Sequence, residues 1–118
     1  MDIYFFSNDA KTSEEIKALC QDLGFNFSVT GPGYLDMKLS DIIGGAKPSS
    51  SRFVLAGVPD HIIFSGDVAD NLDLFLDSYR KRGIRRIALK AVVTVHNLSW
   101  TLKELLEELR KEERMMNR

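Results

Sequence analysis

The feature that most constrains the fold is a strand–helix–strand pattern that occurs twice. In the first half, an apolar run at residues 3–6 precedes a helical pattern and an alternating run at residues 25–29. In the second half, an apolar run at residues 62–64 precedes another helical pattern and an apolar segment at residues 84–95. Runs of β-branched and aromatic residues predict strands, and apolar residues three or four apart predict helices. The chain therefore predicts two βαβ units and a mixed α/β fold.

The helices of the two units have predictable ends. In the first unit, Thr12 and Glu15 form a capping-box pattern and Gly24 is suited to the left-handed conformation that ends a helix. In the second, the turn at residues 65–67 leads into the helix and Gly83 closes it. The two units together account for most of the regular structure that the sequence predicts.

A third helix follows the second unit. Thr101 and Glu104 form another capping-box pattern, and Trp100 is placed to pack against Leu105. This helix has an apolar stripe and alternating charges on its other face, which is typical of a helix with one buried side.

Two arrangements fit these elements. We expect a ferredoxin-like two-layer sandwich with an additional C-terminal helix, in which helices cover one face of the sheet. The alternative is a small parallel four-stranded sheet with helices on both faces, because the second-half strands are apolar throughout. With 118 residues, 44% of them hydrophobic, residues 1–118 are expected to form a single domain around one core. Residues 52–59 would be a short strand or a covering loop.

Lys90 is the unusual residue, since it stands inside an almost unbroken apolar strand. Side chains alternate between the faces of a strand, so Lys90 and Thr94 share one face and His96 joins them if the extended conformation continues. Asn97 and Trp100 follow directly. This grouping predicts a ligand pocket in which Lys90 meets an anionic group, Thr94 and Asn97 form hydrogen bonds, and Trp100 gives an apolar wall.

Other interpretations remain open. Lys90 could simply lay its stem over the sheet with its ammonium in water, and Trp100 could only anchor the last helix. An enzyme could use Lys90 as base or Schiff-base amine and His96 as proton carrier. Ser65 and Gly66 form a second candidate anion site at a predicted helix N-terminus, although Asp67 would compete for it.

The remaining reactive residues give little sign of chemistry. His61 and His96 are the only histidines and lack a metal-binding spacing, so we predict neither a metal site nor a cofactor. Cys20 lies on the apolar stripe of its helix, where a cysteine usually packs without reacting. We therefore expect a binding or regulatory protein more than an enzyme.

The charge pattern names no macromolecular partner. The net charge is -1, and the basic cluster Arg80–Arg86 follows an acidic stretch of the same helix, so phosphate or RNA binding there is only an alternative. We expect an anionic small molecule or a protein partner, no nucleic acid and no membrane. Met115 and Met116 could form a homodimer contact. The N-terminus lacks the features of a secretory signal, which favours the cytoplasm.

The second half resembles a bacterial family known as domain of unknown function 3783. The resemblance covers residues 62–113 well and the first half loosely. It rests on an LKAVxT strand, an asparagine and a WTLxELLEEL helix, which correspond here to Leu89, Lys90, Ala91, Val92, Thr94, Asn97, Trp100, Thr101, Leu102, Glu104 and Leu105. The resemblance implies a small bacterial protein without an assigned activity, and it groups Lys90, Thr94, Asn97 and Trp100 as one unit.

Overall fold

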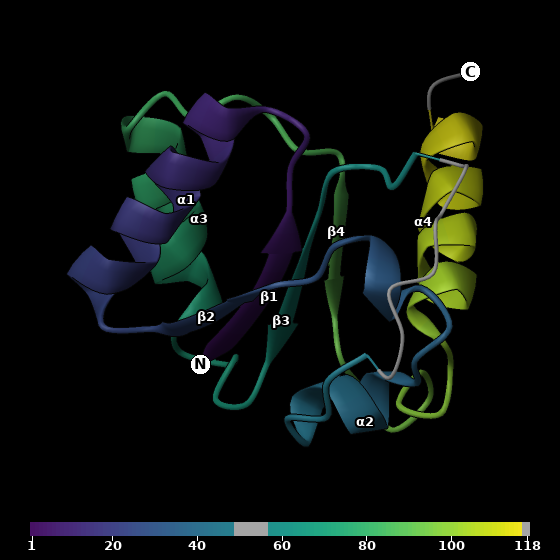
Figure 1. The fold of residues 1–118 in the computed structure, drawn as a ribbon. Coiled ribbons are helices and arrows are strands. Elements are labelled where there is room, and N and C mark those ends of the chain that lie inside the picture. The colour runs from purple at the N-terminus through teal and green to yellow at the C-terminus, as the bar shows by residue number, and fades with distance from the viewer. Residues whose placement is uncertain (49–56, 117–118) are drawn as a thin grey trace.

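The computed structural model describes residues 1–48 and 57–116, which contain four strands, four α-helices and one short 3-10 helix (Figure 1). The strands are β1 (Asp2–Phe6), β2 (Asn26–Val29), β3 (His61–Ser65) and β4 (Leu89–Val92). The helices are α1 (Ala10–Leu23), η1 (Pro32–Tyr34), α2 (Leu39–Ile43), α3 (Leu72–Lys81) and α4 (Leu102–Met116). Residues 52–56, part of the predicted strand or covering loop, lie outside the described residues.

The strands form one mixed sheet in the order β2-β1-β3-β4. Within each half the two strands are parallel neighbours, β1 with β2 and β3 with β4. The halves meet through β1 and β3, which are antiparallel. The two predicted βαβ units and the mixed α/β class are thereby confirmed.

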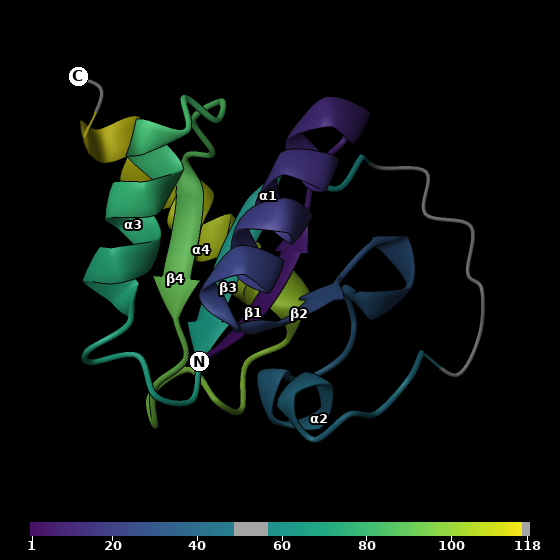
Figure 2. The same ribbon diagram turned by 90° about the vertical axis from the view of Figure 1, so that its left-hand side faces the viewer.

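Helices cover both faces of the sheet (Figures 1 and 2). On one face, α1 and α3 pack over the first core, which we call the α1/α3 core: Ile3, Phe5, Ile16, Leu19, Cys20, Ile62, Phe64, Phe75, Tyr79, Ile84 and Ile87. On the other face, α2 and α4 pack over the second, the α4 core: Leu39, Ile42, Val58, Ile63, Leu89, Leu102, Leu105 and Leu106. The molecule is therefore a three-layer structure, with the sheet in the middle.

The ferredoxin-like prediction is corrected by this topology. In a split βαβ arrangement another strand lies between the two strands of each unit, whereas here β1 and β2 are direct neighbours. The layering follows the alternative, with helices on both faces, but the sheet is mixed and not parallel throughout. The physical reason is that β3 is buried at all five positions, so both faces of the sheet need an apolar cover.

The helix ends agree with the sequence in part. The capping box of α4 is present, since Glu104 N–H donates to Thr101 Oγ1 at 3.2 Å and Thr101 N–H donates to Glu104 Oε1 at 3.3 Å. The cap of α1 is Asp9, whose side chain accepts from the Thr12 N–H at 3.0 Å, so the capping box predicted at Thr12 is wrong. Among the described residues, no helix is both long and apolar enough to cross a membrane.

The last strand is shorter than its apolar pattern predicts. Leu89 pairs with His61, the first residue of β3, and among the described residues no strand lies beside residues 84–88. After Val92 the chain turns through residues 94–99 and does not continue as a strand. Hydrophobic character was therefore a poor guide to strand length here, because the partner strand sets where the pairing stops.

Candidate functional site

Lys90 lies on the face of β4 that looks toward α3. Its Nζ is 5.9 Å from the centre of the Tyr79 ring. Leu89 belongs to the α4 core, whereas Val92 packs against the α1/α3 core, so the predicted alternation is present in β4. Burial lowers the pKa of Lys90 below its ordinary value, Arg86 lowers it further, and Glu113 opposes them. Lys90 is thus a half-buried cation over an aromatic face.

Thr94, His96 and Asn97 lie in the turn that follows β4. Asn97 Oδ1 accepts from the Thr94 N–H at 2.8 Å, and Asn97 Nδ2 donates to the Val92 carbonyl at 3.1 Å. Thr94 Oγ1 accepts from the His96 N–H at 3.2 Å, while the His96 side chain is exposed. The polar groups of Thr94 and Asn97 close the turn, which is the usual role of such residues beside a strand end.

Trp100 lies on the other side of the sheet from Lys90. Its side chain packs against the α4 core, and its carbonyl accepts from the Leu39 N–H at 2.8 Å. It therefore joins α2 to the start of α4, as a packing residue at a helix start does. The structure does not bring Lys90 and Trp100 together in one pocket.

Ser65 ends β3 and Gly66 follows it, and neither residue begins a helix. Helix α3 starts only at Leu72, after a turn in which the Val68 N–H donates to the Gly66 carbonyl. Gly66 has φ 81°, and a Cβ there would lie 3.4 Å from Asp2 Oδ2. The helix start that we predicted beside these residues is wrong, because the left-handed glycine opens a loop first.

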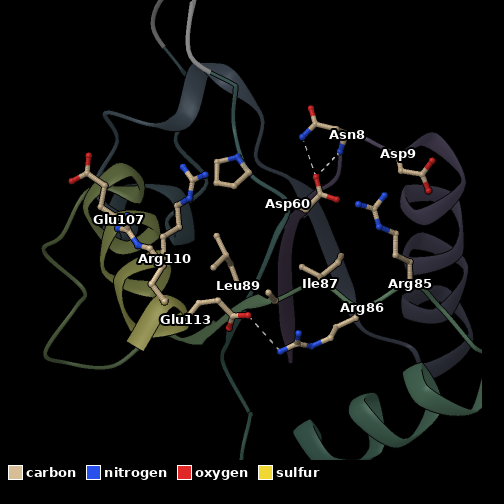
Figure 3. Close-up of a pocket in the computed structure, with 13 residues that line it drawn as sticks. Asn8, Asp9, Asp60, Arg85, Arg86, Ile87, Leu89, Glu107, Arg110 and Glu113 are labelled. Atoms are coloured by element: carbon tan, nitrogen blue, oxygen red, sulfur yellow. Dashed lines mark hydrogen bonds and ion pairs between the residues drawn. The ribbon is translucent and has the colours of Figure 1, made fainter. Parts of the chain in front are cut away.

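A pocket of about 1030 Å³ lies elsewhere, between α4 and the end of the sheet where β1 finishes and β3 and β4 begin (Figure 3). None of the seven predicted site residues lines it. Its lining is Asn8, Asp9, Pro59, Asp60, Arg85, Arg86, Ile87, Ala88, Leu89, Glu107, Arg110, Glu113 and Arg114. We take this pocket as the candidate functional site, because a concave surface with an apolar floor and converging polar groups is the usual form of a ligand site.

Two of the pocket's carboxylates, Asp60 and Asp9, form hydrogen bonds that stabilise the local backbone. Asp60 accepts from Ser7 Oγ at 2.8 Å and from the N–H and Nδ2 of Asn8 at 2.8 and 3.0 Å. Asp9 caps α1, and the hydrogen bonds from the Thr12 side chain and N–H lower its pKa, with a smaller contribution from the positive charge of Arg85. Both side chains are therefore engaged in hydrogen bonds, and they build the wall that joins the end of β1 to the start of β3.

Most of the pocket arginines have no acidic partner in an ion pair among the described residues. Arg86 forms an ion pair with Glu113, at 3.7 Å between Nη2 and Oε1. Within residues 1–48 and 57–116, no ion pair is present for Arg85, Arg110 or Arg114, whose side chains are exposed. Among the described residues, three pocket arginines thus have no ion pair, whereas Glu107 is the one pocket acid whose side chain has neither a hydrogen bond nor an ion pair.

The basic cluster Arg80–Arg86 is divided by the fold. Arg80 pairs with Asp77 at 2.5 Å and Arg82 pairs with Asp22 at 2.7 Å, both outside the pocket. Only Arg85 and Arg86 reach the pocket. Sequence patterns do not indicate that Arg110 and Arg114 lie near Arg85 and Arg86, because alternating charges on a helix are typical of a solvated face. Their spacing of four residues indicates only that the two share one side of the helix.

A buried histidine stands behind the pocket wall. His61 is fully buried, with Nδ1 2.9 Å from the Pro59 carbonyl and Nε2 2.8 Å from Thr30 Oγ1. A carbonyl can only accept, so Nδ1 carries the proton and the Thr30 hydroxyl donates to Nε2 of the neutral ring. Burial lowers the pKa of His61, while the Pro59 carbonyl and Asp60 oppose this. His61 therefore fixes the approach of Pro59 and Asp60 to the sheet.

Catalytic groups of other kinds are not assembled in the described part of the chain. It contains no group of three or more His, Cys, Asp or Glu side chains that could hold a metal ion. Cys20 is buried in the α1/α3 core, and burial raises its pKa to about 11, so the thiol stays protonated. Charge and shape, and not a nucleophile, are what the site offers.

Fold and pocket together define a small three-layer α/β domain with an arginine-rich surface pocket. Residues 60–116 match the family model described as domain of unknown function (DUF3783), and this part of the chain belongs to that family. The match covers β3, α3, β4 and α4. This half supplies ten of the pocket's thirteen lining residues, namely those from Asp60 onward. No curated protein and no solved structure matches the chain.

The role of Lys90 in stability can be tested directly. We expect Lys90→Met to change the free energy of unfolding by no more than about 1 kcal/mol, because methionine keeps the apolar stem and only a cation–π contact is lost. Urea unfolding would measure it, with Lys17→Met as control, since Lys17 Nζ lies 5.9 Å from the Phe27 ring. A loss several times larger than in the control would show that the Lys90 amine is needed to hold the fold.

Proposed function

We propose that this protein is a small cytoplasmic binding module whose ligand is an anionic small molecule, held in the arginine-rich pocket. The observation that carries the proposal is the pocket of about 1030 Å³ with an apolar floor, where Arg85, Arg110 and Arg114 have no ion pair among the described residues. Planar guanidinium groups bind carboxylate and phosphate oxygens in pairs. A small molecule is favoured over a protein partner because the surface is concave.

The enzymatic alternative has weaker support. It needs Lys90 and His96 in one closed pocket, but neither residue lines this one. The lowered pKa of Lys90 alone does not supply the proton carrier that such a mechanism requires.

Binding of RNA through Arg80–Arg86 also has weaker support. Arg80 and Arg82 form ion pairs with aspartates, so the cluster is not a continuous basic surface. The remaining pair, Arg85 and Arg86, fits a small anion better than a polymer.

The proposal is tested by thermal unfolding with phosphate, pyrophosphate or citrate, at an ionic strength held constant with chloride. We expect at least one of these anions to raise the Tm, since a ligand at a hundred times its Kd stabilises the folded state by about 2.7 kcal/mol. Arg110→Gln should weaken the effect roughly tenfold in affinity, because one charged hydrogen-bond donor is removed.

The matched control is Arg80→Gln, which removes the same charge outside the pocket. It should leave the anion effect unchanged. No anion effect in the wild type, or an equal loss in both variants, would show that the pocket is not an anion site.

A further inference from the structure

The pocket has cationic groups on two opposite sides. Arg85 follows α3 and stands beside Asp9 at the start of α1, so it belongs to the α1/α3 side of the sheet. Arg110 belongs to α4, on the other side of the sheet. Figure 3 shows the two arginines facing each other across the pocket, with Ile87 and Leu89 between them.

The floor shows how the pocket spans the sheet. Ile87 is buried in the α1/α3 core and Leu89 in the α4 core, and both line the pocket. A cavity that contacts both cores crosses from one layer to the other. The middle of a bound ligand would therefore rest on aliphatic side chains, where polar groups would lose their water without gaining a partner.

The two cationic sides are unequal. Arg110 and Arg114 are four residues apart on α4, so their side chains share one face of the helix and can act on one anionic group. Arg85 acts alone, and Asp9 partly offsets its charge. This asymmetry predicts a primary anion subsite at α4 and a weaker second one at Arg85.

We infer that the ligand carries two anionic groups, one at each end of an apolar or neutral spacer. The α4 arginines bind one end, the aliphatic floor contacts the spacer and Arg85 binds the other end. The inference rests on the proposed function, because it specifies the ligand of the same pocket.

Matched pairs of probes test the inference by isothermal titration calorimetry. Alkane bisphosphonates of increasing length are compared with alkylphosphonates of the same chain, and linear dicarboxylates from succinate to sebacate with the corresponding monocarboxylates. We expect the two-headed probes to bind best at one intermediate length, roughly tenfold or more tighter than their one-headed partners.

Variants separate the two subsites. Arg85→Gln should remove the advantage of the two-headed probe and weaken one-headed binding far less than Arg110→Gln does. Arg110→Gln should weaken the binding of both kinds of probe, and Arg80→Gln should weaken neither. If Arg85→Gln has no selective effect, or no length is preferred, the two-ended ligand is excluded while an Arg110-dependent anion effect still supports the proposed function. If no anion binds in an Arg110-dependent way, both the two-ended ligand and the proposed function are excluded.

Discussion

Phe75→Ala should lower the free energy of unfolding by about 3–5 kcal/mol, the usual cost of removing a fully buried aromatic side chain. Phe75 has no exposed surface and stands edge-on to Phe64 at 5.2 Å between ring centres, and the ring centre of Tyr79 lies 6.1 Å away. The cavity would open where α3 meets the sheet, so neighbouring rings cannot refill it without moving the helix. Chemical unfolding monitored by circular dichroism measures the loss.

The control lies one residue earlier. Leu74 is 48% exposed on the same helix, and Leu74→Ala should cost less than about 1 kcal/mol. Equal losses in the two variants would mean that α3 is rotated from the orientation described above. The prediction thus tests the face that α3 presents to the sheet as well as the size of the core.

Stability should fall as the pH falls below about 6.5, and His61 should be the cause. Its folded pKa lies below the ordinary value of 6.5, so the unfolded chain takes up the proton first. The contribution of His61 to the free energy of unfolding is fully present above pH 6.5. It is lost between pH 6.5 and the folded pKa, at a rate of up to about 1.4 kcal/mol per pH unit. The free energy of unfolding should be measured between about pH 7.5 and pH 5, because this range lies above the ordinary aspartate pKa of 3.8.

The only other histidine provides the comparison. His61→Gln should flatten the dependence on pH in this range, although it will lower stability overall, because glutamine cannot fill the same space. His96→Gln is the matched control for the loss of one imidazole, since that side chain is exposed. A slope that survives in His61→Gln would assign the effect to other groups.

Local patterns predicted the elements better than their assembly. The two βαβ units, the left-handed end of α1 at Gly24 and the capping box of α4 all depend on residues close in sequence, and each is present. Strand order and layering depend on which surfaces remain apolar after pairing, and periodicity does not specify this. The apolar run at residues 62–64 indicates a buried strand, but the sequence does not show that all five residues of β3 are buried, which is what requires helices on both faces.

The candidate site was harder to predict for a related reason. Lys90, Thr94, Asn97 and Trp100 are close in sequence, but the turn after Val92 and the two faces of the sheet separate them. The pocket instead collects Asn8, Asp60, Arg85 and Arg110, from four distant segments. Only the fold brings such residues together, and a single sequence gives no measure of their proximity.

The antiparallel junction of β1 and β3 has a consequence for symmetry. Ile3 pairs with Phe64 and Phe5 with Ile62, on either side of the Tyr4–Ile63 pair. An approximate two-fold axis through that central pair exchanges the isoleucines with each other and the phenylalanines with each other, as it would in an isologous dimer. The two βαβ halves thus meet as two subunits would, within one chain. The helix that follows the second half, α4, has 15 residues, whereas α2, which follows the first, has 5, so α4 breaks this symmetry, and the pocket lies beside the helix that breaks it.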